Sequence, residues 1–176
     1  VDSKRHLQSF LLVRAALRIA CVGRDVWVTA LTENGERLIR PFADQLGVVL
    51  ESPREFKVPC DFPDFELDED QRLEADSVFT PLRKLSQFIQ VNSTINEALF
   101  VGGLFSYDLV ECFEPLPEIE TPGLAPNYVF YVAEELVRLD HVKNEGQLIG
   151  SFFYESHDPE ARVAFERQLD TTGQHC

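Results

Sequence analysis

The sequence has no methionine and no long apolar run. A membrane-spanning helix needs roughly 18 or more consecutive apolar residues, and no stretch comes near that length. The first ten residues, VDSKRHLQSF, also lack the basic and then apolar layout of a secretory signal. We therefore expect a cytoplasmic protein. Because the chain opens at Val1 and contains no methionine, we also expect it to be a piece of a longer protein.

Basic residues are scarce. The chain has 16 Lys and Arg against 30 Asp and Glu, which gives a formal net charge of −14. Nucleic acids and anionic membranes both need Lys and Arg to neutralise them, so this charge argues against both kinds of partner. Residues 59–70, PCDFPDFELDED, contain no Lys or Arg. This acidic segment indicates a solvated loop. A calcium loop is the alternative, but the central glycine and closing glutamate of such a loop are missing.

Motifs that mark catalytic or metal sites are also missing. The four cysteines, Cys21, Cys60, Cys112 and Cys176, form no C-x-x-C pair, and the four histidines are scattered. This spacing predicts reduced thiols and no zinc site. The sequence has no G-x-S-x-G elbow, no G-x-x-x-x-G-K-[ST] loop and no H-E-x-x-H helix. We predict no catalytic, cofactor-binding or metal-binding residue in this chain.

The length and the 44% hydrophobic content predict one globular domain, residues 1–176. Apolar residues recur at near-alternate positions on both sides of a turn at 23–25, which predicts a β-hairpin. A second hairpin is predicted around the turn residues Lys-Asn-Glu-Gly at 143–146. Single strands are predicted near 56–58 and over 98–108.

Residues 34–47 predict an amphipathic helix. Leu38, Ile39, Phe42 and Leu46 share one face of this helix. Gly47 suits its C-terminal cap. Pro41 lies inside the pattern, so we expect the helix to be kinked or shorter than the pattern suggests.

Two further helices are predicted. Residues 76–89 carry an apolar stripe, with Asp76 or Ser77 available as the N-cap. Residues 158–170 begin with the Asp-Pro pair at 158–159, which suits the N-cap and the first helical position. The elements therefore follow as hairpin, helix, strand, helix, hairpin and helix. This order favours an antiparallel α+β domain over a doubly wound parallel sheet.

Two adjacent glycines, Gly102 and Gly103, lie in the aromatic run FVGGLFSYDLVECFE, residues 100–114. Glycine inside a strand marks a bulge or a very close approach of another group. We predict close packing, in which an aromatic side chain from a second packed layer lies against the bare backbone. A ligand or partner domain in the same gap is the alternative. A short helix ended by prolines is predicted at 109–117.

Five segments resemble the N-terminal domain of the large subunit, component I, of anthranilate synthase. They are DSK at 2–4, SFLLVRAALRIACVG at 9–23, ALTENGERL at 30–38, EALFVGGLFSYDLVECFEPLP at 97–117 and PNYVFYVAEELVRLDH at 126–141. The resemblance covers the chain from end to end. It implies an α+β fold in which antiparallel β-sheets pack orthogonally with flanking helices, an α/β/β/α sandwich. This chain would be the N-terminal part of that fold only.

The resemblance also implies a parent enzyme, a lyase. That enzyme converts chorismate plus glutamine, or ammonia, to anthranilate, pyruvate and glutamate in tryptophan biosynthesis. Its Mg²⁺ cofactor and its chorismate bind in a C-terminal catalytic domain that this chain lacks, so no catalytic, cofactor or metal residue is implied here. The implied partners are that C-terminal domain, a glutamine amidotransferase subunit, and L-tryptophan as feedback inhibitor.

Two residues are implied to lie near the tryptophan site. Gln8 stands where the family often has a lysine, and an amide can hydrogen-bond a carboxylate but supplies no positive charge. Arg83 matches an arginine associated with feedback sensitivity in the family. Two alternatives stay open: the equivalent domain of aminodeoxychorismate or isochorismate synthase, and a free-standing acidic interaction module.

Overall fold

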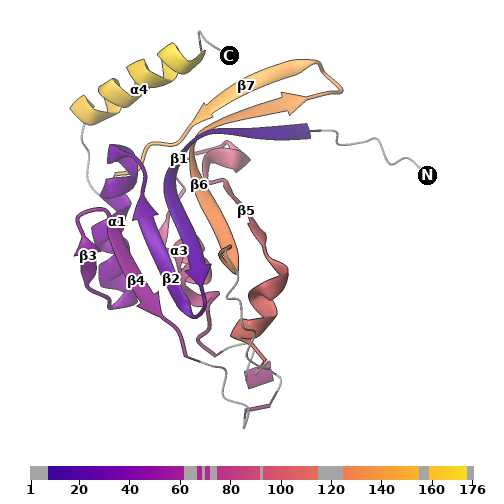
Figure 1. Ribbon diagram of the computed structural model, residues 1–176. Coiled ribbons are helices and arrows are strands. Elements are labelled where there is room, and N and C mark those ends of the chain that lie inside the picture. Colours follow the sequence, from indigo (N-terminus) through magenta and orange to yellow (C-terminus); the bar gives the residue numbers. More distant parts are fainter. Residues whose placement is uncertain are drawn as a thin grey trace.

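The computed structural model describes residues 8–61, 67–68, 70–71, 75–91, 93–114, 125–154 and 159–173. Their strands form one seven-stranded sheet of order β3-β4-β2-β1-β6-β5, with β7 also paired to β6. All neighbouring pairs are antiparallel (Figure 1). The strands are β1 (Gln8–Val22), β2 (Asp25–Ala30), β3 (Leu50–Ser52), β4 (Glu55–Pro59), β5 (Val101–Phe105), β6 (Tyr128–Asp140) and β7 (Glu145–Gly150). The helices are α1 (Glu33–Leu46), α3 (Thr80–Phe88), η1 (Asn96–Ala98), η2 (Tyr107–Cys112) and α4 (Pro159–Gly173).

Both predicted hairpins are confirmed. β1 and β2 pair up to Val22 and Asp25, which leaves a two-residue turn that begins at Gly23 with φ +61°. β6 and β7 pair up to Asp140 and Glu145, and Asn144 in their turn has φ +53°. Glycine and asparagine tolerate this left-handed backbone better than other residues, so the two turns follow from local sequence.

The predicted helix at 34–47 is confirmed as α1. Thr32 is its N-cap and accepts a hydrogen bond from the backbone N–H of Gly35. Gly47 ends it in the left-handed conformation, as a C-terminal glycine does. The helix continues through Pro41 for its full 14 residues, so the expected shortening does not occur. Leu38, Ile39 and Phe42 are buried, and Leu46 is half-buried.

The predicted helix at 76–89 is shorter than expected, and its predicted cap is wrong. α3 begins at Thr80, and its N-cap is Phe79, with no side-chain cap bond. The hydroxyl of Ser77 accepts hydrogen bonds from the Phe79 N–H and from Arg83, and Asp76 accepts one from the Thr80 hydroxyl. These bonds stabilise a turn ahead of the helix.

The remaining elements differ in detail from expectation. β4 contains the strand predicted at 56–58, whereas β3 was not predicted. The short helix predicted at 109–117 starts two residues earlier, at Tyr107, and is a 3₁₀-helix. α4 begins at Pro159 as predicted. The capping residue expected before it and half of the acidic segment 59–70 lie outside the described residues.

One face of the sheet is covered by α1 and α3 and forms the core. Ile19, Val28 and Phe56 lie in one row across β1, β2 and β4, and all are buried. Phe42 of α1 packs edge-on against Phe56, with ring centroids 5.7 Å apart. Tyr128 is fully buried and donates a hydrogen bond of 2.6 Å to the carbonyl oxygen of Val78. Helices and sheet thus share a single apolar layer.

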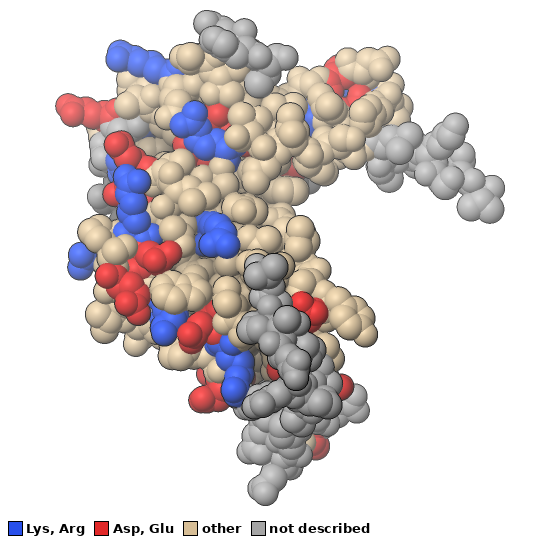
Figure 2. Space-filling model, viewed as in Figure 1, with Lys and Arg blue, Asp and Glu red and all other residues tan. Residues whose placement is uncertain are grey.

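The opposite face of the sheet has no described helix across it. Its central row runs through Trp27, Ala20, Val129 and Leu104, which are register partners across β2, β1, β6 and β5. Leu104 is 59% exposed. Figure 2 shows this side as largely uncharged over the middle of the sheet, with charged side chains gathered on its β3–β4 side. The sheet therefore presents one covered and one open face.

The two glycines permit close approaches within the sheet rather than between layers. A Cβ on Gly103 would lie 2.6 Å from Cγ of Phe130 and still closer to the carbonyl oxygen of Val129. Both residues belong to β6, the adjacent strand. A Cβ on Gly102 would lie 2.7 Å from the ring of Phe100 in the same segment. The aromatic contacts predicted from a second layer are therefore made by neighbours in the sheet.

We predict that Gly103→Ala destabilises the protein by about 1–3 kcal/mol, because the added methyl group meets rigid backbone of β6. Urea unfolding measures the loss. Gly146→Ala is the matched control, since its added Cβ would meet only the end of the Leu139 side chain at 3.4 Å. Equal stability of the two variants would contradict the close approach.

Candidate functional site

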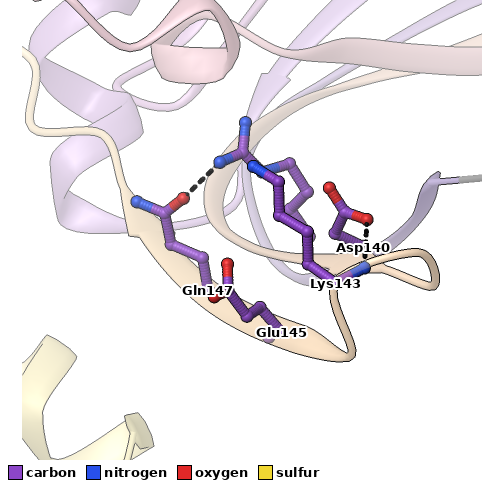
Figure 3. A pocket seen from close by; sticks show the side chains of 6 residues that line it. Asp140, Lys143, Glu145 and Gln147 are labelled. Atoms are coloured by element: carbon purple, nitrogen blue, oxygen red, sulfur yellow. Dashed lines mark hydrogen bonds between the residues drawn. The ribbon is translucent and has the colours of Figure 1, made fainter. Parts of the chain in front are cut away.

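Gln8, the first predicted regulatory residue, lies at the exposed start of β1. Its backbone is the register partner of Asp140 at the end of β6. The adjoining hairpin forms a pocket of about 290 Å³ (Figure 3). The residues that line it are Arg138, Asp140, Lys143, Glu145, Gly146 and Gln147. Gln8 thus borders a polar and open part of the molecule.

The charges around this pocket are held by local hydrogen bonds. Asp140 accepts bonds of 3.0 Å from the backbone N–H groups of Lys143 and Val142. The Lys143 N–H is the larger influence that lowers the pKa of the Asp140 carboxyl. Arg138 donates to Glu97 at 2.9 Å and to Gln147 at 2.6 Å. The pocket offers hydrogen-bonding groups, and two of its charged side chains, Arg138 and Asp140, already make hydrogen bonds.

Arg83, the second predicted regulatory residue, lies in a different part of the fold. It is exposed on α3 and donates a hydrogen bond of 2.9 Å to the hydroxyl of Ser77. α3 packs against α1 on the covered face of the sheet. Gln8 and Arg83 therefore do not share an element or a pocket.

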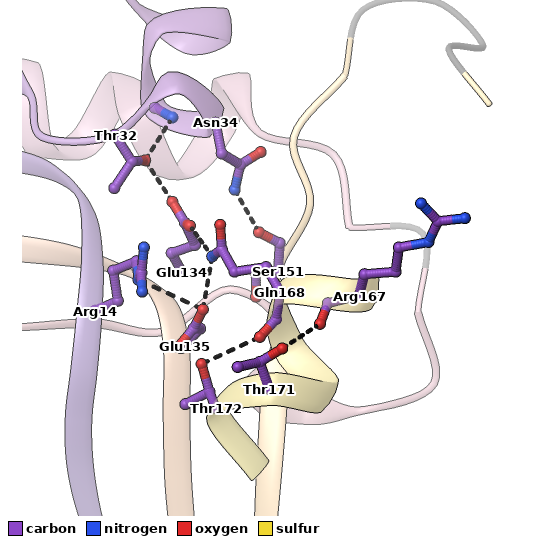
Figure 4. A network of polar contacts seen from close by, with 11 residues as sticks. Arg14, Thr32, Asn34, Glu134, Glu135, Ser151, Arg167, Gln168, Thr171 and Thr172 are labelled. Atoms are coloured by element: carbon purple, nitrogen blue, oxygen red, sulfur yellow. Dashed lines mark hydrogen bonds and ion pairs between the residues drawn. The ribbon is translucent and has the colours of Figure 1, made fainter. Parts of the chain in front are cut away.

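A buried polar network that the sequence analysis missed joins β6 to α4 (Figure 4). The side chains of Glu134 and Glu135 are 2% and 0% exposed. Gln168 of α4 donates to both carboxylates, at 3.2 Å to Glu134 and 2.7 Å to Glu135. Thr32, the N-cap of α1, donates a short hydrogen bond to Glu134. Arg14 of β1 forms an ion pair of 3.4 Å with Glu135.

A register shift between β1 and β6 explains how neighbouring carboxylates reach the same network. Arg14 is the partner of Glu135, and Ala15 is the partner of Ala133, so Glu134 is an extra residue in β6. Such a bulge redirects side chains that would otherwise alternate between the two faces. The sequence signal was the pair of acids inside the apolar strand YVAEELV. Its burial depends on Gln168, which is 33 residues away.

The same region ties α1 to the segment after β7. Asn34 donates a hydrogen bond of 2.8 Å to the carbonyl oxygen of Ser151 and accepts one of 2.9 Å from the N–H of Phe153. Leu169 of α4 lies over Gly150, where an added Cβ would come within 2.5 Å of its side chain. Three elements that are distant in sequence thus meet at the bulge.

A larger cavity of about 1120 Å³ lies between α1, α4 and the segment after β7. Phe88, Phe152 and Phe165 line it, and the guanidinium of Arg37 lies 5.3 Å from the centre of the Phe152 ring. Its charged pair Arg162 and Glu166 is joined by an ion pair of 2.9 Å. This lining provides apolar contact area and a paired acid and base rather than a nucleophile beside a base.

The described residues hold neither a metal-binding cluster nor a membrane-spanning helix. Within the described ranges, no group of three or more His, Cys, Asp or Glu side chains could hold a metal ion. In the same part of the chain, no helix is long and apolar enough to cross a membrane.

The sequence is closely related to one enzyme subunit. Over 183 residues, all of this chain and 32% of the relative, it is 37% identical to anthranilate synthase component 1 of Vibrio parahaemolyticus. Over 168 residues, 93% of this chain and 32% of the relative, it is 40% identical to anthranilate synthase component 1 of Escherichia coli. The chain belongs to the anthranilate synthase component 1 family. It spans about a third of the length of these curated relatives. No family model matches it.

A solved structure of the same subunit has a similar fold. The crystal structure of anthranilate synthase component I from Streptococcus pneumoniae matches with a TM-score of 0.55 and 18% sequence identity. The match covers 99% of this chain and 30% of that one. The predicted α+β class, with an antiparallel sheet and flanking helices, is thereby confirmed.

We predict that Gln168→Ala destabilises the protein by about 1–3 kcal/mol, because two buried carboxylates lose a donor. The midpoint of urea unfolding measures this loss. Arg167→Ala is the control, since the neighbouring Arg167 is exposed on the same helix. If both variants unfold at the same urea concentration, Gln168 does not hold α4 on β6.

Proposed function

We propose that the chain is the non-catalytic N-terminal domain of an anthranilate synthase component 1. The whole protein would be a lyase that converts chorismate and glutamine, or ammonia, to anthranilate, pyruvate and glutamate. The family relation supports a place in tryptophan biosynthesis. The chain itself would supply packing surface and regulation, and the chemistry would take place in the part of the relatives that it does not match.

The open face of the sheet is the observation that carries this proposal. A sheet normally has either two apolar faces that are both buried, or one buried apolar face and one polar face in water. Here Trp27, Val129 and Leu104 form an apolar row that no described helix crosses. Removing such side chains from water stabilises an interface by about 25 cal/mol per Å². We therefore assign this face to contact with the remainder of the protein, as expected for half of an α/β/β/α sandwich.

The site chemistry supports a non-catalytic role. In the polar pocket near Gln8, the side chains of Arg138 and Asp140 are held by hydrogen bonds, and the larger cavity presents mainly apolar side chains. The acidic pair gathered by the fold does not fit a Mg²⁺ site, because both oxygens of Glu134 and one oxygen of Glu135 already contact Gln168, Thr32 or Arg14. We place the Mg²⁺ and chorismate sites of the whole enzyme outside this chain.

Regulation by L-tryptophan belongs to the same proposal. Gln8 borders an open polar pocket whose groups could hydrogen-bond an amino acid. Arg83 lies on α3, which packs against α1, and does not line that pocket. We therefore assign it an indirect effect on inhibition by tryptophan. Tryptophan would inhibit only by binding one state of the enzyme more tightly than another. A glutamine amidotransferase subunit would be the second partner, in the cytoplasm.

The first test uses the full-length protein. With chorismate, ammonia and Mg²⁺, it should produce anthranilate, followed by fluorescence, and L-tryptophan should lower the rate. The 176-residue chain alone should produce none. Turnover by the isolated chain would contradict the proposal, as would a full-length protein that yields aminodeoxychorismate or isochorismate instead.

The second test addresses the open face. Leu104→Glu should destabilise the full-length protein by about 2 kcal/mol, the scale of burying one leucine, and the isolated chain by less than about 0.5 kcal/mol. Thermal unfolding measures both values. Val49→Glu is the control, because Val49 is 87% exposed and lies away from the sheet face. An equal effect of Leu104→Glu in both proteins would show that the face is not covered.

A further inference from the structure

Two cysteines meet at the turn of the first hairpin. Cys21, near the end of β1, donates a hydrogen bond of 3.2 Å to the carbonyl oxygen of Gly23. Cys112, at the end of η2, donates one of 3.0 Å to the same oxygen. The two residues are 91 positions apart in sequence, yet their sulfur atoms share one acceptor. Because both bonds end on one oxygen atom, the two sulfur atoms cannot lie further apart than the sum of those two distances.

The backbone around the two thiols is held in place independently. Asn127, which is 5% exposed, accepts a hydrogen bond of 2.7 Å from the N–H of Gly23 and donates one of 3.0 Å to the carbonyl of Asp108 in η2. The N–H of Asn127 donates to the carbonyl of Cys21 at 2.8 Å. The hairpin turn, η2 and the start of β6 are thereby joined.

The two thiols are chemically unequal. When Cys112 loses its proton, Cys21 can donate a hydrogen bond to the thiolate, and this bond lowers the pKa of Cys112. The same interaction, together with burial, raises the pKa of Cys21. Cys112 is thus the better nucleophile of the two, and Cys21 lies beside it. Both thiols are buried, at 0% and 2% exposure, so a hydroperoxide reaches Cys112 when the β1–β2 turn and η2 open locally.

The third described cysteine provides a contrast. The sulfur of Cys60, just after β4, lies 3.7 Å from the carbonyl oxygen of Val58 in that strand. It does not share the Gly23 acceptor of the other two thiols. Burial raises the pKa of Cys60 to about 11. It is therefore a poor nucleophile near neutral pH, which makes it an internal reference for the other two.

We propose that Cys21 and Cys112 form a reversible disulfide when the protein encounters a hydroperoxide. This modification site stands apart from the proposed function and does not depend on it. The bond would link the β1–β2 turn to η2, and η2 follows directly after β5, which carries Leu104 of the open face. Oxidation would therefore fix the position of one edge of that face.

The reaction balances with a hydroperoxide as the only oxidant. The thiolate of Cys112 attacks one oxygen of hydrogen peroxide, the O–O bond breaks, and hydroxide leaves and takes up a proton to form water. The sulfur of Cys21 then attacks the sulfenic sulfur of Cys112 and gives up its proton to the departing oxygen as it does so. The S–S bond forms, and the sulfenic oxygen leaves as a second water. Two thiols have lost two electrons and two protons, and a dithiol reductant reverses the change.

The test treats the full-length protein with hydrogen peroxide, blocks free thiols by alkylation and digests with trypsin. Cleavage after Arg18, Arg24 and Lys84 places Cys21 and Cys112 in separate peptides. Mass spectrometry should find these peptides joined, with the loss of two hydrogens, and separated again by dithiothreitol. Cys21→Ala and Cys112→Ala should each abolish the joined species, whereas Cys60→Ala should leave its yield unchanged.

Hydrogen exchange gives a second measurement that does not depend on peptide recovery. Oxidation of the unmodified protein should slow exchange of the η2 amides by about tenfold or more, because the bond removes local opening. Cys112→Ala should show no such change. The proposal is overturned if peroxide leaves both thiols free, if it converts Cys112 to a sulfinic acid without a link, or if the link joins either residue to Cys60 or Cys176.

Discussion

The pairing of β6 with three other strands is the constraint on which the rest of the structure depends. β1 runs along one edge of β6 from Tyr128 to Asp140. The other edge is shared in succession, by β5 up to Val132 and by β7 from Glu135 onward. Between them, the N–H of Ala133 bonds the carbonyl of Phe100, and the carbonyl of Glu134 accepts from Ser151. β6 therefore changes its partner from β5 to β7 at the same place where its register with β1 shifts.

The position of the bulge determines where polar groups can be buried. An extra residue in β6 leaves backbone and side chains out of the regular alternation, and the side chains of Glu134 and Glu135 gather there. Burying two carboxylates is costly unless donors surround them. Thr32, Gln168 and Arg14 supply those donors from α1, α4 and β1. The network is therefore specific to this arrangement of elements, and it fixes α4, whose own apolar contacts are few.

Local sequence determined the parts of the fold that could be predicted. The two hairpins and α1 depend on turn residues, apolar periodicity and a C-terminal glycine that lie close together in sequence, and these were expected; the N-cap Thr32 was not. The start of α3 was not, because Ser77 and Asp76 bond to groups of the following turn rather than cap a helix. The acidic pair in β6 was missed because its donors come from elements far away in sequence. The partner of Gly103 was also misplaced, since only the register shows that Phe130 of the adjacent strand fills the space.

The length of β1 connects the residue proposed to lie near tryptophan to the pair of cysteines proposed to be oxidised. Gln8 begins this strand beside the β6–β7 turn, and Cys21 lies near its other end beside η2. A paired strand transmits a displacement along its axis but can absorb one where its register is irregular, and β1 is irregular between Leu12 and Leu17. A ligand at the Gln8 end would therefore act first on the bulge, and through Glu134, Glu135 and Gln168 on α4. The core half of β1, held between β2 and β6, would move less. If tryptophan acts at Gln8, its effect should pass to α4 before it reaches the open face of the sheet.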